Sequence, residues 1–124
     1  PLAEMVMITN REGFIIFVNK AFERETGYAR TDVIGKTPAV LKSGRHTQAF
    51  YRQLWNTLHS GQTFEAEFLN CKKTGDLFYE DKIIFPIQNP NHRIAHFVAI
   101  GKSKTPNDGD GEKGYSRTLM NDIA

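Results

Sequence analysis

The sequence predicts an α+β domain in which five strands form one antiparallel sheet with short helices and one longer helix on a single face. Three observations predict this class. Two apolar runs joined by a turn occupy 5–18, an amphipathic stripe fills 46–60, and three more strand-like runs follow at 63–103. Two strands, then helices, then three strands joined by short turns is the order expected of an antiparallel sheet with helices gathered on one side.

The first two strands are predicted to form a hairpin. Met5–Thr9 is the first strand, and Phe14–Val18 is dense in the β-branched and aromatic residues that favour a buried strand. The residues between them, 10–13, end in Gly13, which tolerates the positive φ of a tight turn. The hairpin is too small to bury much alone, so it is expected to join a sheet supplied by the rest of the chain.

Two short helices are expected after the hairpin. Asn19 ends the second strand, and its side-chain oxygen can cap the helix that contains Phe22. Gly27 stands at the position where a helix commonly ends. Asp32 lies in the first turn of the second helix, and Gly35 ends it.

A longer helix is predicted over 46–60. Pro38 excludes a regular helix interior, so 37–45 is interpreted as a helical turn followed by a loop. Either Ser43 or Thr47 can cap the longer helix. Its apolar stripe, at the helical spacing i, i+4 and i+8, consists of Phe50, Leu54 and Leu58.

The last three strands are predicted at 63–72, 77–87 and 93–103, joined by turns at 73–76 and 89–91. Side chains alternate between the two faces of a strand. The parity of the first of these strands places four residues on the inner face: Phe64, Ala66, Phe68 and Asn70.

The sequence indicates a single domain at 1–105, followed at 106–124 by a flexible polar linker and the start of a segment that leads to an output domain. The 124 residues carry a net charge of +2, which gives no reason to expect nucleic acid or an anionic membrane as a partner. Cys71 is the only cysteine, so no internal disulfide forms and a reducing cytoplasmic location is expected. The spacing of apolar residues over 115–124 leaves a frayed tail and the start of a helix as equal alternatives.

The chain resembles the PAS (sensory box) family, whose pattern is roughly D-x-x-G-x-I-x-x-x-N-x-x-F-x-x-x-T-G-Y-x-x-x-x-x-I-G-K. Asn10 stands where the family usually has Asp, and the resemblance continues to about Thr105. It implies the PAS fold, with the strands in the spatial order 2-1-5-4-3. The matching residues are Gly13, Ile15, Asn19, Phe22, Thr26, Gly27, Tyr28, Ile34, Gly35 and Lys36.

A ligand cavity is expected between the helices and the inner sheet face. The competing interpretation is a core filled by side chains, because Phe-rich faces are more often core than cofactor sites. Asn70 and Glu80 have inward parity, and a buried polar group without a partner costs about 1–3 kcal/mol. Asn70 therefore needs a side chain, a water or a ligand. The residues expected to line the cavity are Phe50, Leu54, Phe64, Phe68, Asn70, Glu80, Phe97 and Gly101.

Segment 35–42 resembles the flavin-binding segment of LOV photoreceptors, G-x-N-C-R-F-L-Q. Pro38 occupies the position of the photoactive cysteine, so no light-driven cysteinyl adduct can form there. Asn70 matches one flavin-contacting Asn of that family, whereas Glu80 replaces the other. Gly101 stands where LOV domains carry a Gln on the last strand.

Other segments are closer to the redox-sensing flavin PAS domains of nitrogen-fixation regulators and aerotaxis receptors. These segments are 41–44, 54–55 and 67–70, although Phe64 stands where those domains usually carry Trp. The sequence therefore leaves three alternatives for the content of the cavity: flavin, another small ligand, or no cofactor.

The remaining polar residues are expected at the surface. Haem PAS sensors place a coordinating His in the long helix, facing the cavity. The four histidines here are assigned to the surface, which disfavours haem: His46, His59, His92 and His96. Glu65 and Glu67 are interpreted as a solvated strand face, with lysines of a neighbouring strand as partners. No metal spacing and no cluster of nucleophile and base is found, so the domain by itself is expected to be non-enzymatic.

The outer sheet face is predicted to be apolar and to bind a second copy of the chain. Its interface residues are expected to be Tyr79, Ile83, Phe85, Val98 and Ile100. Ile94 is assigned to the same face by parity. A flanking segment of the chain is the alternative cover.

Resemblance to PAS domains implies a sensory domain that controls an output domain in the same chain. A diguanylate cyclase is the first choice of output domain, with a histidine kinase or a transcription factor as alternatives. Many PAS domains end in D-x-T, which launches a rigid signalling helix, whereas this chain has Ser103-Lys104-Thr105 followed by Pro106. The alternative functions are a cofactor-free dimerisation module and a flavin-binding redox sensor.

Overall fold

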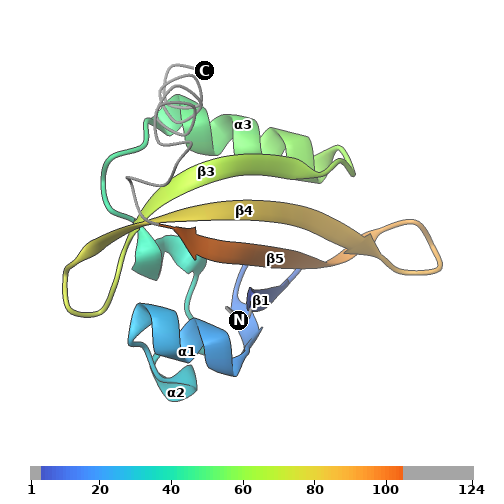
Figure 1. The fold of residues 1–124 in the computed structure, drawn as a ribbon. Coiled ribbons are helices and arrows are strands. Elements are labelled where there is room, and N and C mark those ends of the chain that lie inside the picture. The colour runs from blue at the N-terminus through green and yellow to red at the C-terminus, as the bar shows by residue number, and fades with distance from the viewer. Residues whose placement is uncertain (1–3, 105–124) are drawn as a thin grey trace.

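Five strands form one antiparallel sheet in the computed structural model, which describes residues 4–104 (Figure 1). The spatial order is β2-β1-β5-β4-β3, so the order expected from the resemblance is confirmed. The strands are β1 (Met5–Asn10), β2 (Ile15–Val18), β3 (Phe64–Cys71), β4 (Leu77–Gln88) and β5 (Ile94–Lys104). The helices are α1 (Lys20–Thr26), α2 (Arg30–Val33), the 3₁₀ helix η1 (Pro38–Leu41) and α3 (Gln48–His59). The linker and tail expected at 106–124 lie outside the described residues.

Asn19 joins the hairpin to the first helix. Its Oδ1 accepts hydrogen bonds from the backbone N–H of Phe22 in α1 and of Val6 in β1, both at 3.0 Å. The predicted helix cap is therefore confirmed, and the same side chain also fixes α1 against the sheet. Gly27 ends α1 with φ +79, a left-handed conformation that favours glycine.

The start of α3 resolves the choice between two candidate caps. Thr47 Oγ1 accepts a hydrogen bond from the N–H of Phe50 at 3.1 Å, so Thr47 is the cap. The helix begins two residues later than predicted, at Gln48. Its stripe of Phe50, Leu54 and Leu58 is buried, as expected from the helical spacing.

The helices pack on one face of the sheet and divide the core into two clusters. Figure 1 shows α3 running along β3, while α1 and α2 lie toward the β1 side. One cluster joins α1 and α2 to β1 and β2 through residues that include Phe22, Val33 and Met7. The other joins α3 to β3 and β5 through residues that include Phe50 and Phe97. The sheet residues of both clusters share the inner parity, which confirms the predicted layering.

A bulge overturns the assignment of Ile94 to the outer face. Ile87 pairs with His96, but the next residue of β4, Gln88, pairs with Ile94, so Ala95 is an extra residue in β5. An extra residue reverses the alternation of side chains. Ile94 consequently packs against the inner cluster that contains Phe97.

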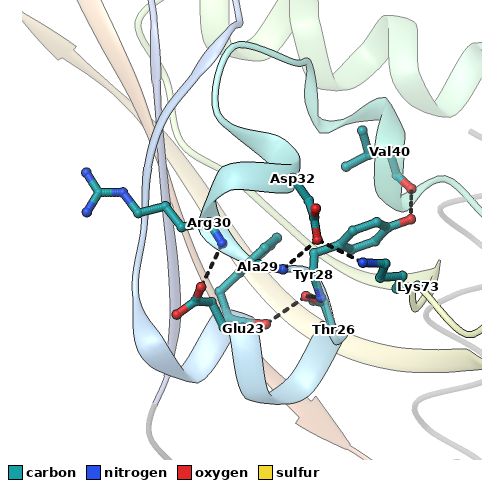
Figure 2. A network of polar contacts seen from close by, with 9 residues as sticks. Glu23, Thr26, Tyr28, Ala29, Arg30, Asp32, Val40 and Lys73 are labelled. Atoms are coloured by element: carbon teal, nitrogen blue, oxygen red, sulfur yellow. Dashed lines mark hydrogen bonds and ion pairs between the residues drawn. The ribbon is translucent and has the colours of Figure 1, made fainter.

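The turn between β3 and β4 is tied to α2 by an ion pair (Figure 2). Lys73 Nζ lies 3.0 Å from Asp32 Oδ2, which also accepts a hydrogen bond from the N–H of Ala29 at 2.9 Å. The hydrogen bond from Lys73, and then that from Ala29, hold the pKa of Asp32 below its usual value. The N–H of Lys73 donates to the carbonyl of Thr26, so the turn is anchored to α1 as well.

None of the helices within residues 4–104 is both long enough and apolar enough to cross a membrane.

Candidate ligand cavity

A cavity of about 300 Å³ lies between the helices and the inner sheet face, and members of both core clusters line it. Three exposed residues form part of its wall on the η1 side: Thr37, Ala39 and Lys42. The apolar wall includes Leu54, Trp55, Leu58, Ile84, Phe97 and Ala99. A volume of this size is at the lower end of that typical for small-molecule sites.

Four of the eight residues expected at the cavity line it: Leu54, Phe68, Asn70 and Phe97. Phe50 and Phe64 do not line the cavity, because their rings pack edge-to-face against each other and against Phe68, with centroid distances of 5.1–6.3 Å. Glu80 and Gly101 do not line the cavity either, and Glu80 lies behind the wall, in contact with the lining residues Asn70 and Lys82.

Asn70, Glu80 and Lys82 form a buried polar network. Asn70 Nδ2 donates to Glu80 Oε1 at 3.1 Å, and Lys82 Nζ lies 3.3 Å from the same oxygen. All three residues are at most 9% exposed. Lys82 Nζ also lies 4.7 Å from the ring centroid of Phe68, a distance typical of a cation–π interaction. The partner that Asn70 requires is therefore supplied by the protein itself.

Gly101 makes room for the carboxylate of Glu80. A Cβ atom built on Gly101 would lie 2.0 Å from Glu80 Oε2 and 2.8 Å from its Cδ. Real atoms do not approach so closely, so any other residue at this position would displace Glu80. LOV domains carry a Gln at the position of Gly101. In this chain the space beside Gly101 is filled by the Glu80 side chain of the neighbouring strand β4.

Lys82 is a charged residue of the cavity wall that sequence reasoning missed. It shares the inward parity of Glu80 and comes two residues later on β4, so the alternation that identified Glu80 was also the signal for Lys82. Lys42 was missed too, and its Nζ lies 4.1 Å from the ring centroid of Tyr51. Both lysines line the cavity.

The assignment of His46 to the surface was wrong. Its side chain is 9% exposed, Nε2 accepts a hydrogen bond from the N–H of Leu69 at 2.9 Å, and the ring stacks on Phe50 at 4.2 Å. It precedes α3 and faces the aromatic cluster rather than the cavity. His59 and His92 are exposed and His96 is half-buried.

The assignment of Glu67 to a solvated face was also wrong, although Glu65 is exposed as expected. Glu67 is 1% exposed and forms an ion pair with Lys104 at the end of β5. Lys104 Nζ also lies 3.6 Å from Asp81 Oδ1, so this lysine links the last strand to β3 and β4. The partner is a lysine, as expected, but it lies on β5, which is not a neighbour of β3 in the sheet, and Glu67 is buried rather than solvated.

The outer sheet face carries apolar side chains in cross-strand rows. Phe85 of β4 is paired with Val98 of β5, which is paired with Ile8 of β1, and that residue is paired with Phe17 of β2. A second row joins Ile83, Ile100 and Val6. Within residues 4–104, no group of three or more His, Cys, Asp or Glu side chains is arranged to hold a metal ion.

A profile of the PAS domain family matches residues 3–106. The chain belongs to the PAS domain family. A PAS domain is a sensory module of signal-transduction proteins rather than a catalytic domain.

Two relatives show where such domains occur. The chain is 30% identical to the nitrogen fixation regulatory protein of Klebsiella oxytoca over 95 residues, which is 77% of this chain and 19% of that protein. It is 33% identical to the blue-light-activated histidine kinase of Brucella anthropi over 85 residues, or 68% of this chain and 17% of that protein. The PAS domain thus spans less than a fifth of these relatives.

Solved structures show the same fold. The LOV domain of the blue-light activated histidine kinase from Erythrobacter litoralis EL346 superposes with a TM-score of 0.76 at 22% identity, covering 85% of this chain and 99% of that one. The PAS domain of a Colwellia psychrerythraea protein gives a TM-score of 0.69 at 21% identity, covering 84% and 88%. The resemblance to the LOV-like and nitrogen-fixation branches is thereby confirmed at the level of family and fold.

Proposed function

We propose that this PAS domain senses a small molecule held in its inner cavity and passes the signal to an output domain of the same chain. The observation that carries the proposal is the buried polar network at a mostly apolar cavity: Asn70 and Lys82 reach its wall, and both contact Glu80, which does not line it. Apolar pockets with a few convergent polar groups are the usual form of small-molecule sites. Ligand binding would shift the balance between two packings of the sheet.

The proposal divides the chain into a sensory domain at 1–105 and a linker at 106–124, in a cytoplasmic protein. A diguanylate cyclase is our first choice of output domain on the resemblance to other sensory boxes. A histidine kinase is the alternative favoured by the name of the Brucella relative.

Two alternatives have observations in their favour. A cofactor-free dimerisation module is supported by Glu80, because it satisfies Asn70 without a ligand. A flavin-binding redox sensor is supported by Asn70, which lines the cavity at the position of a flavin-contacting residue. Against flavin, the Glu80 carboxylate occupies the space beside Gly101.

An absorption spectrum of the purified protein, followed by denaturation and analysis of the released small molecules, separates these functions. A ligand sensor is expected to release one small molecule per chain. Visible absorbance that is lost from the protein on denaturation identifies flavin or haem. A colourless protein that releases nothing and binds no added probe would contradict the proposal and leave the dimerisation module.

We further propose that the outer face binds a second copy of the chain through Tyr79, Ile83, Phe85, Val98 and Ile100. Changing Phe85→Glu places a charge within the proposed interface, at the β4 end of the first apolar row, and is expected to convert a dimer into a monomer in analytical ultracentrifugation. Ile34→Glu is the control, because Ile34 is 40% exposed and follows α2 rather than lying in the sheet. A wild-type monomer, or a dimer unchanged by Phe85→Glu, would refute this interface.

A further inference from the structure

The charged residues of the cavity wall are all cations in the part of the chain that the structure describes. Lys42 and Lys82 line the cavity, whereas no Asp or Glu side chain among residues 4–104 does so. Glu80 neutralises Lys82 from behind the wall, on the side of Gly101. A ligand in the cavity therefore meets ammonium groups rather than carboxylates.

Lys82 has hydrogen-bonding capacity beyond its partner Glu80. An ammonium group carries three N–H donors and no acceptor, and one donor is enough for Glu80 Oε1 at 3.3 Å. The centroid of the Phe68 ring lies 4.7 Å from Nζ, and this cation–π interaction attracts the ammonium group without a hydrogen bond from one of its N–H donors. Asn70, on the same wall, adds the one amide N–H of Nδ2 that does not donate to Glu80.

Lys42 extends this polarity to the cavity rim. It is exposed, and the Tyr51 ring lies 4.1 Å from its Nζ. A cation at the rim and a second cation in the interior favour the entry and retention of an anion. The rest of the wall is mostly apolar, so the body of such a ligand must be mostly apolar as well.

We infer that the cavity takes a small apolar ligand with one anionic group, which pairs with Lys82. This inference rests on the proposed function, since it names the chemistry of the ligand for the same cavity. A carboxylate or sulfonate on an aromatic or aliphatic body fits the description. The charge-assisted hydrogen bond to Lys82 then offsets the cost of removing the anion from water.

A matched pair of fluorescent probes tests this inference. The anionic probe is 1-anilinonaphthalene-8-sulfonate, and the neutral probe is N-phenyl-1-naphthylamine, which has the same rings without the sulfonate. Dissociation constants are measured for the wild type, Glu80→Gln and the double variant Glu80→Gln/Lys82→Met. The double variant leaves no unpaired buried charge and has the same formal charge as the wild type. Shifts of the methyl NMR signals of Leu54 and Leu58, which line the cavity, show that a probe binds there.

The expected result is a preference for the anionic probe that depends on Lys82. Between Glu80→Gln and the double variant, the affinity ratio of anionic to neutral probe should fall roughly tenfold, the effect of one hydrogen bond to a charged group. Glu80→Gln alone should raise the ratio above that of the wild type, because it removes the negative charge beside the ammonium. Lys42→Met serves as the rim control, and its effect should be roughly twofold, as is typical of an exposed charge.

Two other outcomes overturn the inference in distinguishable ways. If the neutral probe binds in the cavity but the ratio is the same with and without Lys82, the ligand class is wrong and the proposed sensory cavity stands. If neither probe binds to any variant, the cavity does not admit ligands, and the proposed function fails together with the inference.

Discussion

Replacing Lys82 with Met is expected to lower the free energy of unfolding by about 3–5 kcal/mol, the cost of breaking a buried ion pair by removing one partner. Glu80 is 3% exposed, and without Lys82 its carboxylate keeps only the hydrogen bond from Asn70 among the contacts described above. Urea denaturation of the isolated domain measures the change.

Two further variants separate this effect from the loss of an ordinary lysine. Glu80→Gln/Lys82→Met removes both charges and should recover most of the lost stability, because no buried charge is left alone. Lys102→Met, at an exposed position of β5, should stay within about 0.5 kcal/mol of the wild type. A Lys82→Met variant as stable as Lys102→Met would show that the buried pair does not form.

Replacing Gly101 with Ala is expected to lower the free energy of unfolding by about 1–3 kcal/mol, the usual cost of overpacking a core. The added Cβ would lie 2.0 Å from Glu80 Oε2, so the carboxylate must leave its position beside Asn70 and Lys82. Gly101 is not among the glycines with positive φ, and backbone strain therefore plays no part.

A double-mutant cycle isolates the steric conflict. When Glu80→Ala/Lys82→Met is the background, the space beside Gly101 is free, and Gly101→Ala should be neutral or stabilising because alanine is the better strand residue. The coupling energy between Gly101 and the pair Glu80/Lys82 is then about 1–3 kcal/mol. If Gly101→Ala lowers the free energy of unfolding equally in both backgrounds, the Glu80 side chain does not occupy the space beside Gly101.

Local signals in the sequence predicted the framework of this domain well. Asn19 was recognised as a helix cap and Thr47 was one of two candidates for the cap of α3, because a cap depends on residues only three positions away. The alternation of β3 and β4 also placed Asn70 and Glu80 on the inner face. Such features need no knowledge of which strands are neighbours, although the strand order itself came from the resemblance.

The errors concern contacts made across the fold. Ile94 was misplaced because a bulge interrupts the alternation that parity assumes. Glu67 was assigned to solvent because its partner, Lys104, is 37 positions away and on a strand that is not its neighbour in the sheet. The contact between Glu80 and Gly101 likewise depends on how β4 and β5 lie side by side, which the sequence pattern alone does not specify.

Native mass spectrometry of the full chain, purified from cells, tests most directly whether a small molecule occupies the cavity. Ala99→Phe serves as the comparison, since Ala99 lines the cavity and a phenyl ring there would fill it. The expected result is a wild-type protein that carries one non-covalent small molecule and a folded Ala99→Phe variant at the mass of the bare chain. Bare mass for both proteins, or the same bound molecule on both, would contradict a ligand in this cavity.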